Sequence, residues 1–304
     1  MKGIVLYPML SLSLLASAFA AESRPVPVTS PGATPGPVFI FEAPDDKDIP
    51  AGEFGRMVRR GQDIFMNTAK ELPDNVGNSL RCVNCHLDRG RLANSAPLWA
   101  AYPMYPAYRK KTNKVDTIEE RIQGCFQFSM NGKAPALDSE AMKALVTYNY
   151  WLSKGAPTGM ELPGRGYPEL PKPSRRPSPE NGKNLYTHHC SICHGPDGQG
   201  QMTRGEMVFP PLWGAQSYNW GAGMHRVNTA ASFIKHNMPL GKGNTISNED
   251  AWDLAAFVNS HERPQDPRFK GNLEETDKVF HDENCLYGER VNHVKLGSRP
   301  ANPD

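Results

Sequence analysis

The chain has 304 residues, enough for two domains of ordinary size and too many for one small core. It carries 34 basic and 32 acidic residues and a net charge of +2, so its charge balance gives no indication of nucleic-acid binding. Its six cysteines could form three disulfides in an exported protein, but their spacing favours another use.

The first twenty residues have the pattern of an export signal. Lys2 supplies the positive end, an apolar stretch follows, and an Ala-Phe-Ala sequence ending at Ala20 forms a cleavage site. A membrane anchor is the alternative, but the apolar stretch is short and Pro8 interrupts it. No later segment is apolar enough to span a bilayer. We therefore expect cleavage near Ala20 and a soluble, periplasmic protein without a membrane span.

Two C-x-x-C-H motifs, CVNCH at 82–86 and CSICH at 190–194, predict two covalently bound haem c groups. The two thiols of each motif would add to the two vinyl groups of one porphyrin, and the adjacent histidine would bind the iron. The predicted attachment residues are Cys82, Cys85, Cys190 and Cys193, and the predicted iron ligands are His86 and His194.

The surroundings of the two motifs form an internal repeat. A glycine followed by an aromatic residue, in a short predicted helix, precedes each motif, and Ser178 with Pro179 begins the second of these helices. Pro-Leu-Trp follows each motif, at 97–99 and 211–213, where a proline carbonyl should orient the ligand histidine. Each half then closes with a helix, which we expect over 139–155 and over 247–262, each beginning with a serine cap.

Residues 162–179 separate the halves and contain six prolines, which excludes a helix or a central strand and predicts a semi-rigid connector. The predicted fold is all-α, with two tandem class I cytochrome c domains over 38–161 and 180–263. The first would hold haem 1 and the active site, and the second haem 2 and the electron exit. A tail over 264–304 has weak periodicity and should wrap over the surface.

Met238 is the predicted sixth ligand in the second half. It precedes Pro239 and lies 44 residues after His194. A Met ligand raises the haem potential and suits electron transfer. The competing side chains are three methionines that better suit core packing, and two basic residues that only a particular turn would bring to the iron: Met202, Met207, Met224, Lys235 and His236.

The equivalent position in the first half is Met130, which also lies 44 residues after its motif histidine, His86. If the repeat held throughout, the protein would be a symmetric dihaem electron carrier with two His/Met haems. Met130 is followed by Asn131 rather than by proline, however, and a cysteine lies five residues before it.

That cysteine, Cys125, lies on a predicted helix that begins with a capping box at 117–120. Arg121, Cys125 and Ser129 are spaced four apart and should share one face, placing a thiol between a cation and a hydroxyl near the haem. The alternative is a disulfide between Cys125 and Cys285, the two cysteines outside the haem motifs.

The RIQGCFQFSMNGK segment, the two C-x-x-C-H motifs and the NMPLG segment together resemble the dihaem thiosulfate dehydrogenase family. The resemblance spans about residues 50 to 262 and leaves the tail unmatched. In that family the cysteine of this segment is an axial ligand of the first haem, which makes Cys125 the counterpart. Some members have lysine immediately before the second-haem methionine. Asn237 stands there in this chain, which implies His194/Met238 ligation without Lys235.

The resemblance implies that two thiosulfate ions are joined to tetrathionate with release of two electrons, or the reverse. Two dianions repel each other strongly in a shielded site, so cations are required. Cys125 would carry the sulfur adduct, Arg121 and Lys133 would bind sulfonate oxygens, and Ser129 would donate a hydrogen bond. The residues that could line the entry are Arg109, Lys110 and Lys111.

Electrons would then pass from the first haem to the second, and on to a soluble c-type cytochrome or a similar carrier. The main alternative function is a dihaem electron-transfer cytochrome with two His/Met haems and no substrate. A third is a haem subunit of a larger sulfur-oxidising complex.

Overall fold

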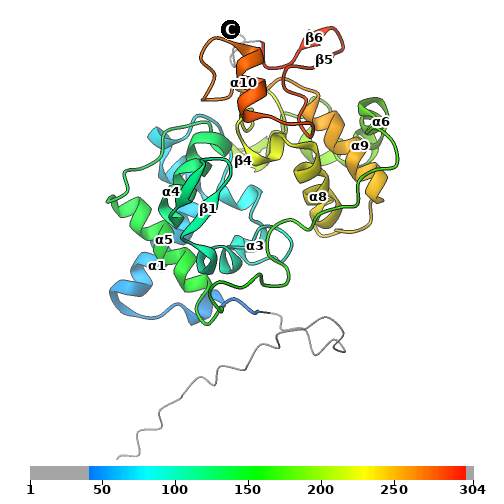
Figure 1. Cartoon of the computed structure of the whole chain (residues 1–304). Helices are drawn as coiled ribbons and strands as arrows, with labels where there is room; N and C mark the ends of the chain where they lie inside the picture. Colours follow the sequence, from blue (N-terminus) through cyan, green and yellow to red (C-terminus); the bar gives the residue numbers. More distant parts are fainter. Residues whose placement is uncertain (1–40, 299–304) are drawn as a thin grey trace, which may run out of the picture. The chain divides into compact units, whose positions relative to one another are not determined.

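Helices dominate the part of the chain that the computed structural model describes, residues 41–298 (Figure 1). All of these residues belong to one compact unit. No helix among them has the length and apolar character of a membrane span. The predicted export signal, residues 1–20, lies outside the described residues.

The first half contains two longer helices, α1 (Gly52–Met66) and α5 (Glu140–Leu152), which pack against each other. Shorter elements connect them: η1 (Asp46–Asp48), α2 (Thr68–Glu71), η2 (Pro73–Asn75), η3 (Cys82–Asn84), α3 (Leu87–Gly90), η4 (Leu98–Ala100), η5 (Tyr102–Met104), α4 (Ile118–Gly124) and η6 (Cys125–Ser129). The first haem motif thus follows α1, and the predicted Cys125 segment precedes α5.

The second half repeats this plan with α6 (Pro179–His189) packed against α9 (Asn248–Asn259). Between them lie α7 (Ser191–His194), η7 (Gly223–His225) and α8 (Val227–Asn237), and α8 also packs on α9. The core of this half is apolar and centres on Tyr186, Trp213, Ile246, Ala251, Leu254 and Val258.

The glycine of the sequence repeat lies where the paired helices cross. A Cβ atom on Gly61 of α1 would lie 2.1 Å from the carbonyl oxygen of Ala144 in α5. In the second half, a Cβ on Gly182 of α6 would lie 2.1 Å from the carbonyl oxygen of Asp253 in α9. Only glycine permits this approach of two backbones, so the repeated glycine sets the same helix crossing in both halves.

The predicted helix caps are confirmed. Ser139, Ser178 and Ser247 accept hydrogen bonds from the backbone N–H groups at the starts of α5, α6 and α9. Thr117 and Glu120 form both bonds of a capping box at the start of α4. Each of these bonds satisfies a backbone donor that has no partner inside its helix.

Three short antiparallel hairpins modify the predicted all-α fold. They pair β1 (Ala107–Arg109) with β2 (Lys114–Asp116), β3 (Gln201–Thr203) with β4 (Glu206–Phe209), and β5 (Arg290–Val291) with β6 (Val294–Lys295). Strands of two to four residues contain too few alternating positions to give a sequence signal.

The proline-rich segment has no helix or strand over residues 162–178, and it contacts both halves. Its Gly164 and Gly166 carbonyls accept hydrogen bonds from Asn94 and Ala96 in the first half. Near its other end, Arg175 binds the carboxylate of Asp253 in α9 at 2.9 and 2.5 Å. Contacts near both of its ends therefore hold the segment against the two halves.

The tail differs from the predicted surface wrap because it has a core of its own. Helix α10 (Leu273–Phe280) and the β5–β6 hairpin belong to it. Cys285, Tyr287 and Leu296 are buried there against Trp220 of the second half. The weak helical periodicity of the tail arises because these buried residues lie mostly in loops, where burial follows no regular period.

We predict that Asp253→Asn lowers the free energy of unfolding by about 1–3 kcal/mol at neutral pH. Burial alone would raise the pKa of Asp253, but hydrogen bonds from Arg175, Asn181 and the Ser178 amide outweigh burial and lower it. Because the folded pKa lies below the unfolded one, the stabilisation is complete above about pH 4 and is lost as the pH falls through the folded pKa.

Urea unfolding followed by circular dichroism across this pH range measures the difference between the two proteins. Asp138→Asn is the control, since Asp138 is exposed and makes no side-chain hydrogen bond to another described residue. A difference that persists unchanged at the lowest pH would contradict the prediction.

Candidate functional site

Both motif histidines are held by a loop carbonyl. Nδ1 of His86 lies 2.6 Å from the carbonyl oxygen of Ala96, and Nδ1 of His194 lies 2.9 Å from that of Pro210. Donation from Nδ1–H leaves Nε2 as the metal-binding nitrogen. The expected proline carbonyl is therefore present in the second half, whereas in the first half the acceptor belongs to Ala96, the residue before Pro-Leu-Trp.

The motif cysteines suit covalent attachment of haem. All four are free thiols. Burial, together with the nearby charge of Cys125, raises the pKa of Cys82 and Cys85 to about 12. Thr68 helps to fix the first thiol, because its hydroxyl accepts a hydrogen bond from the Cys82 amide and lies 3.4 Å from the Cys82 sulfur.

Cys125 lies among cationic and imidazole groups. Nη1 of Arg121 donates to the Cys125 sulfur at 3.4 Å, so the predicted contact one helical turn apart is present. Burial alone would raise the pKa of this thiol, but Arg121, His86 and Lys111 outweigh burial and lower it to about 6. The charge of Cys125 in turn raises the pKa of Arg121. Cys125 is therefore a thiolate at neutral pH and lies close to the His86 ring.

The segment that carries Cys125 is a π-helix, η6, in which the Met130 amide bonds to the Cys125 carbonyl. Two buried asparagines bind its last carbonyls. Asn219 donates from its side chain to Gln127 at 2.9 Å and from its backbone to Phe128 at 3.2 Å. Asn78 donates to Ser129 at 2.9 Å. A residue of the second half thus holds the turn that presents Cys125, and π-helical turns occur frequently at functional sites.

The other predicted residues of this segment are placed less favourably. The wider turn of the π-helix breaks the four-residue spacing that would place Ser129 on one face with Arg121 and Cys125. The Ser129 hydroxyl makes no hydrogen bond to another described residue. Lys133 is exposed, and its backbone pairs with Asn75. Met130 is 3% exposed and belongs to the core.

Lys111 helps to lower the pKa of Cys125, whereas the sequence indicated only that it could line the entry. Its Nζ lies 3.6 Å from the centre of the Phe128 ring and donates to the Gly221 carbonyl. Burial of the ammonium and the neighbouring Arg268 and Arg121 lower the pKa of Lys111. The residue as a whole is exposed, so solvent reaches part of its side chain. The basic run at 109–111 was the only sequence signal for this lysine.

In the second half, Met238 directly follows α8 and is half-buried. Lys235 is engaged elsewhere, because its Nζ donates to the Ile246 carbonyl at 2.7 Å and to the Asn244 carbonyl at 3.2 Å. His236 bonds through Nδ1 to the Ser232 carbonyl of its own helix at 2.9 Å. These contacts favour Met238 among the residues at this end of α8.

The alternative disulfide between Cys125 and Cys285 is wrong, because both thiols are free. Cys125 has Arg121 beside it, whereas the Cys285 sulfur lies 2.9 Å from Nδ1 of His225. Burial raises the pKa of Cys285 to about 12. The two leftover cysteines therefore lie in different surroundings.

Comparisons with known proteins assign a cytochrome c domain to each half. Residues 69–158 match the family described as "SoxA/TsdA, cytochrome c domain". Residues 177–258 match "Cytochrome C oxidase, cbb3-type, subunit III". Together with the fixed histidines and free thiols, these matches show a protein with two covalently bound haem c groups.

Relatives match along most of the chain. It is 58% identical over 260 residues to a thiosulfate dehydrogenase of Stutzerimonas stutzeri, covering 84% of this chain and 85% of the relative. It is 51% identical over 284 residues to a thiosulfate dehydrogenase of Thiomonas intermedia, covering 93% and 90%. The solved thiosulfate dehydrogenase (TsdBA) from Marichromatium purpuratum matches with a TM-score of 0.83 and 47% identity over 86% of this chain. This chain spans 58% of the length of that solved chain.

We predict that Asn219→Ala alters the ligand environment of the first haem and leaves that of the second unchanged, because it frees the Gln127 carbonyl of the Cys125 turn. The loss of buried hydrogen bonds should also lower the free energy of unfolding by about 1–3 kcal/mol. Optical and electron paramagnetic resonance spectra of the oxidised protein report the haem environments, and urea unfolding reports stability.

The matched control is Asn248→Ala, since Asn248 is exposed and its side chain makes no hydrogen bond to another described residue. Unchanged first-haem spectra in Asn219→Ala would show that the asparagine does not position the turn.

Proposed function

The chain belongs to the thiosulfate dehydrogenase family, and we propose that it interconverts thiosulfate and tetrathionate. In the oxidative direction two thiosulfate ions form one tetrathionate ion and release two electrons. The observation that carries this proposal is the Arg121–Cys125 contact in the first half, where a partly buried sulfur with a lowered pKa lies close to a haem-binding histidine.

The proposed organisation keeps the predicted division. Residues 38–161 form the domain of haem 1 and the active site, and residues 180–263 form the domain of haem 2, with the proline-rich linker over 162–179 between them. The tail, 264–304, follows. The matched cytochrome segments, 69–158 and 177–258, support these divisions without setting their ends.

We propose that His86 and Cys125 bind the first iron and that His194 and Met238 bind the second. When bound, the two haems each accept one electron. A thiolate ligand lowers a haem potential and a Met ligand raises it, so electrons would run from the first site to the second. They would leave to a soluble c-type cytochrome or a similar carrier, in the periplasm if the predicted export signal acts.

Cys125 carries the sulfur chemistry in this proposal. When displaced from iron, its thiolate forms a bond with the terminal sulfur of one thiosulfate, and this step releases two electrons. The terminal sulfur of a second thiosulfate then attacks that same sulfur. Tetrathionate leaves, and the Cys125 thiolate is restored. No proton is transferred, which suits a cysteine that is already ionised at neutral pH.

Cations must reduce the repulsion between the thiolate and two dianions. Arg121 already contacts the sulfur, and a guanidinium presents a planar fork that suits sulfonate oxygens. Lys111 adds a second positive charge near Cys125 when it is protonated, and its pKa is lowered to about 7. Ser129 and Lys133 remain proposed sulfonate contacts, and Lys133 would act from the exposed surface.

We predict that Cys125→Ala abolishes turnover in both directions while both haems stay attached, since it removes the only sulfur proposed to carry the adduct. Met130→Leu is the matched control. It roughly preserves the volume of a buried side chain, should cost less than about 1.5 kcal/mol of stability, and should leave turnover largely intact.

Steady-state assays with an artificial acceptor and an artificial donor measure the two directions. Mass spectrometry of the same samples verifies haem attachment. Normal turnover in Cys125→Ala, with loss of a haem ligand in Met130→Leu, would instead establish the dihaem electron carrier with two His/Met haems.

We predict that Met238→Ala removes the Met-ligand spectral signature of the second haem and lowers its potential. The physical reason is the loss of a thioether that stabilises ferrous iron. Spectra recorded during a redox titration separate the two haems. Met202→Ala is the control, because Met202 is 61% exposed on the β3–β4 hairpin. An unchanged potential in Met238→Ala would require another ligand.

A further inference from the structure

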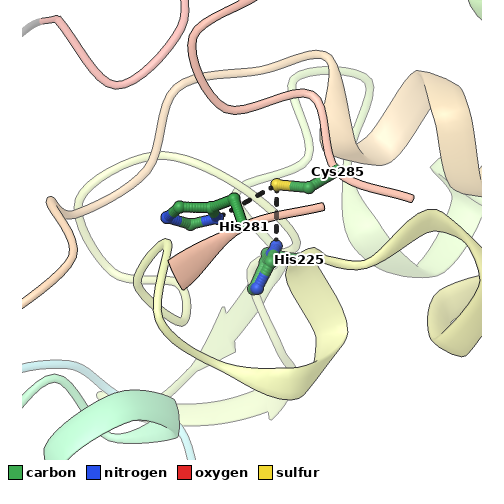
Figure 2. A group of neighbouring side chains, drawn as sticks. All are labelled: His225, His281 and Cys285. Carbon is green, nitrogen blue, oxygen red and sulfur yellow. Dashed lines mark hydrogen bonds between the residues drawn. The ribbon is translucent and has the colours of Figure 1, made fainter. Parts of the chain in front are cut away.

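A second cluster of metal-binding side chains lies outside both haem sites (Figure 2). It consists of His225 from η7 and of His281 and Cys285 from the tail. Nδ1 of His225 lies 2.9 Å from the Cys285 sulfur, and Nδ1 of His281 lies 3.3 Å from it. His225 and Cys285 are each 5% exposed, and the His281 side chain is fully buried.

The surroundings fix the orientation of these donors. The Tyr287 amide donates to the Cys285 sulfur at 3.3 Å, and the Tyr287 ring stacks on His281 with centroids 4.1 Å apart. Nε2 of His281 lies 3.3 Å from the carboxylate of Asp266. A carboxylate behind the far nitrogen of a ligand histidine is the usual arrangement that orients the ring at metal sites.

Hydrogen bonding alone satisfies the three facing atoms of this cluster in a single protonation pattern. A neutral imidazole has one donor and one acceptor nitrogen, and a thiol has a single proton. Nε2 of His281 is buried without a hydrogen-bond partner and has the Asp266 carboxylate 3.3 Å away. A proton on Nε2, the nitrogen nearer this anion, makes Nδ1 an acceptor. The sulfur must then donate its proton to His281 and accept one from His225. One bound cation would satisfy both Nδ1 atoms and a thiolate together.

We propose that His225, His281 and Cys285 bind one late transition-metal ion, copper or zinc, at a site separate from the haems. Donors that lie about 2.0–2.3 Å from one ion are themselves about 3–4 Å apart. The two sulfur–nitrogen separations, 2.9 and 3.3 Å, are close to that range. The softness of a thiolate with two imidazoles selects copper or zinc over magnesium or calcium.

The number of ligands favours copper. Among the described residues only these three form a group able to hold an ion. Structural zinc sites almost always have four protein ligands, whereas two histidines and one cysteine form the trigonal set found at copper sites. Because His225 precedes Cys285 by 60 residues, the ion would fasten the tail to the second cytochrome half and stabilise its fold.

The test uses the mature dihaem protein, purified from cells supplied with copper or with zinc. Metal analysis counts the ion against the two irons of the haems. We expect about one copper or zinc per two irons, and the two supplies identify which ion is retained. X-ray absorption at its edge should show one sulfur at about 2.3 Å and two nitrogens at about 2.0 Å.

Cys285→Ser and His225→Gln should each lose the ion and keep both irons. His293→Ala should retain it, because His293 is an exposed histidine of the same tail.

Chelation of the wild-type ion should lower the melting temperature, and metal readdition should restore it. This readout does not depend on the variants folding. Substoichiometric metal under both supplies, or full retention in Cys285→Ser, overturns the proposal. None of these measurements uses thiosulfate, so they are independent of the proposed reaction.

Discussion

The contact between the Arg121 guanidinium and the Cys125 sulfur is the interaction on which the proposed active site depends. Burial by itself favours the neutral thiol, which is a poor nucleophile and a poor ligand. A fixed cation one helical turn away reverses that preference. The Thr117 capping box starts the helix that brings the two side chains together. A single local element therefore supplies the charge state on which both iron binding and sulfur chemistry rest.

The position of that sulfur, by contrast, depends on contacts between the two halves. A π-helical turn leaves carbonyl groups that an α-helix would pair internally, and buried carbonyls without partners are costly. Asn219 of the second half and Asn78 of the first supply the missing donors. The domain proposed to export electrons is thus also part of the scaffold of the proposed catalytic domain. This arrangement gives a structural reason for keeping both cytochrome domains in one chain.

Features coded locally could be predicted from the sequence, and features made by long-range contacts could not. The haem motifs, the serine caps and the repeated glycine each depend on a few adjacent residues, and each has its expected place. Lys111 gains its role only because Phe128 and Gly221 lie beside it, and Ser129 loses its predicted alignment because the helix widens. The tail looked featureless because its buried residues lie in loops. Cys285 of the tail and His225 of the second half are 60 residues apart and come into contact only in the folded chain.

Cys125 and Cys285 show how surroundings decide what a thiol can do. Cys125 is partly and Cys285 fully removed from water, which alone raises a thiol pKa. Cys125 has Arg121 and Lys111 near it, so its thiolate persists without a metal and can react with an approaching sulfur. Cys285 has two imidazoles and a backbone amide around it, none of which carries a fixed positive charge, and its pKa rises to about 12. Such a thiol stays protonated unless a cation displaces its proton. In our proposals the same residue type therefore supplies a nucleophile in the first half and a metal ligand in the tail.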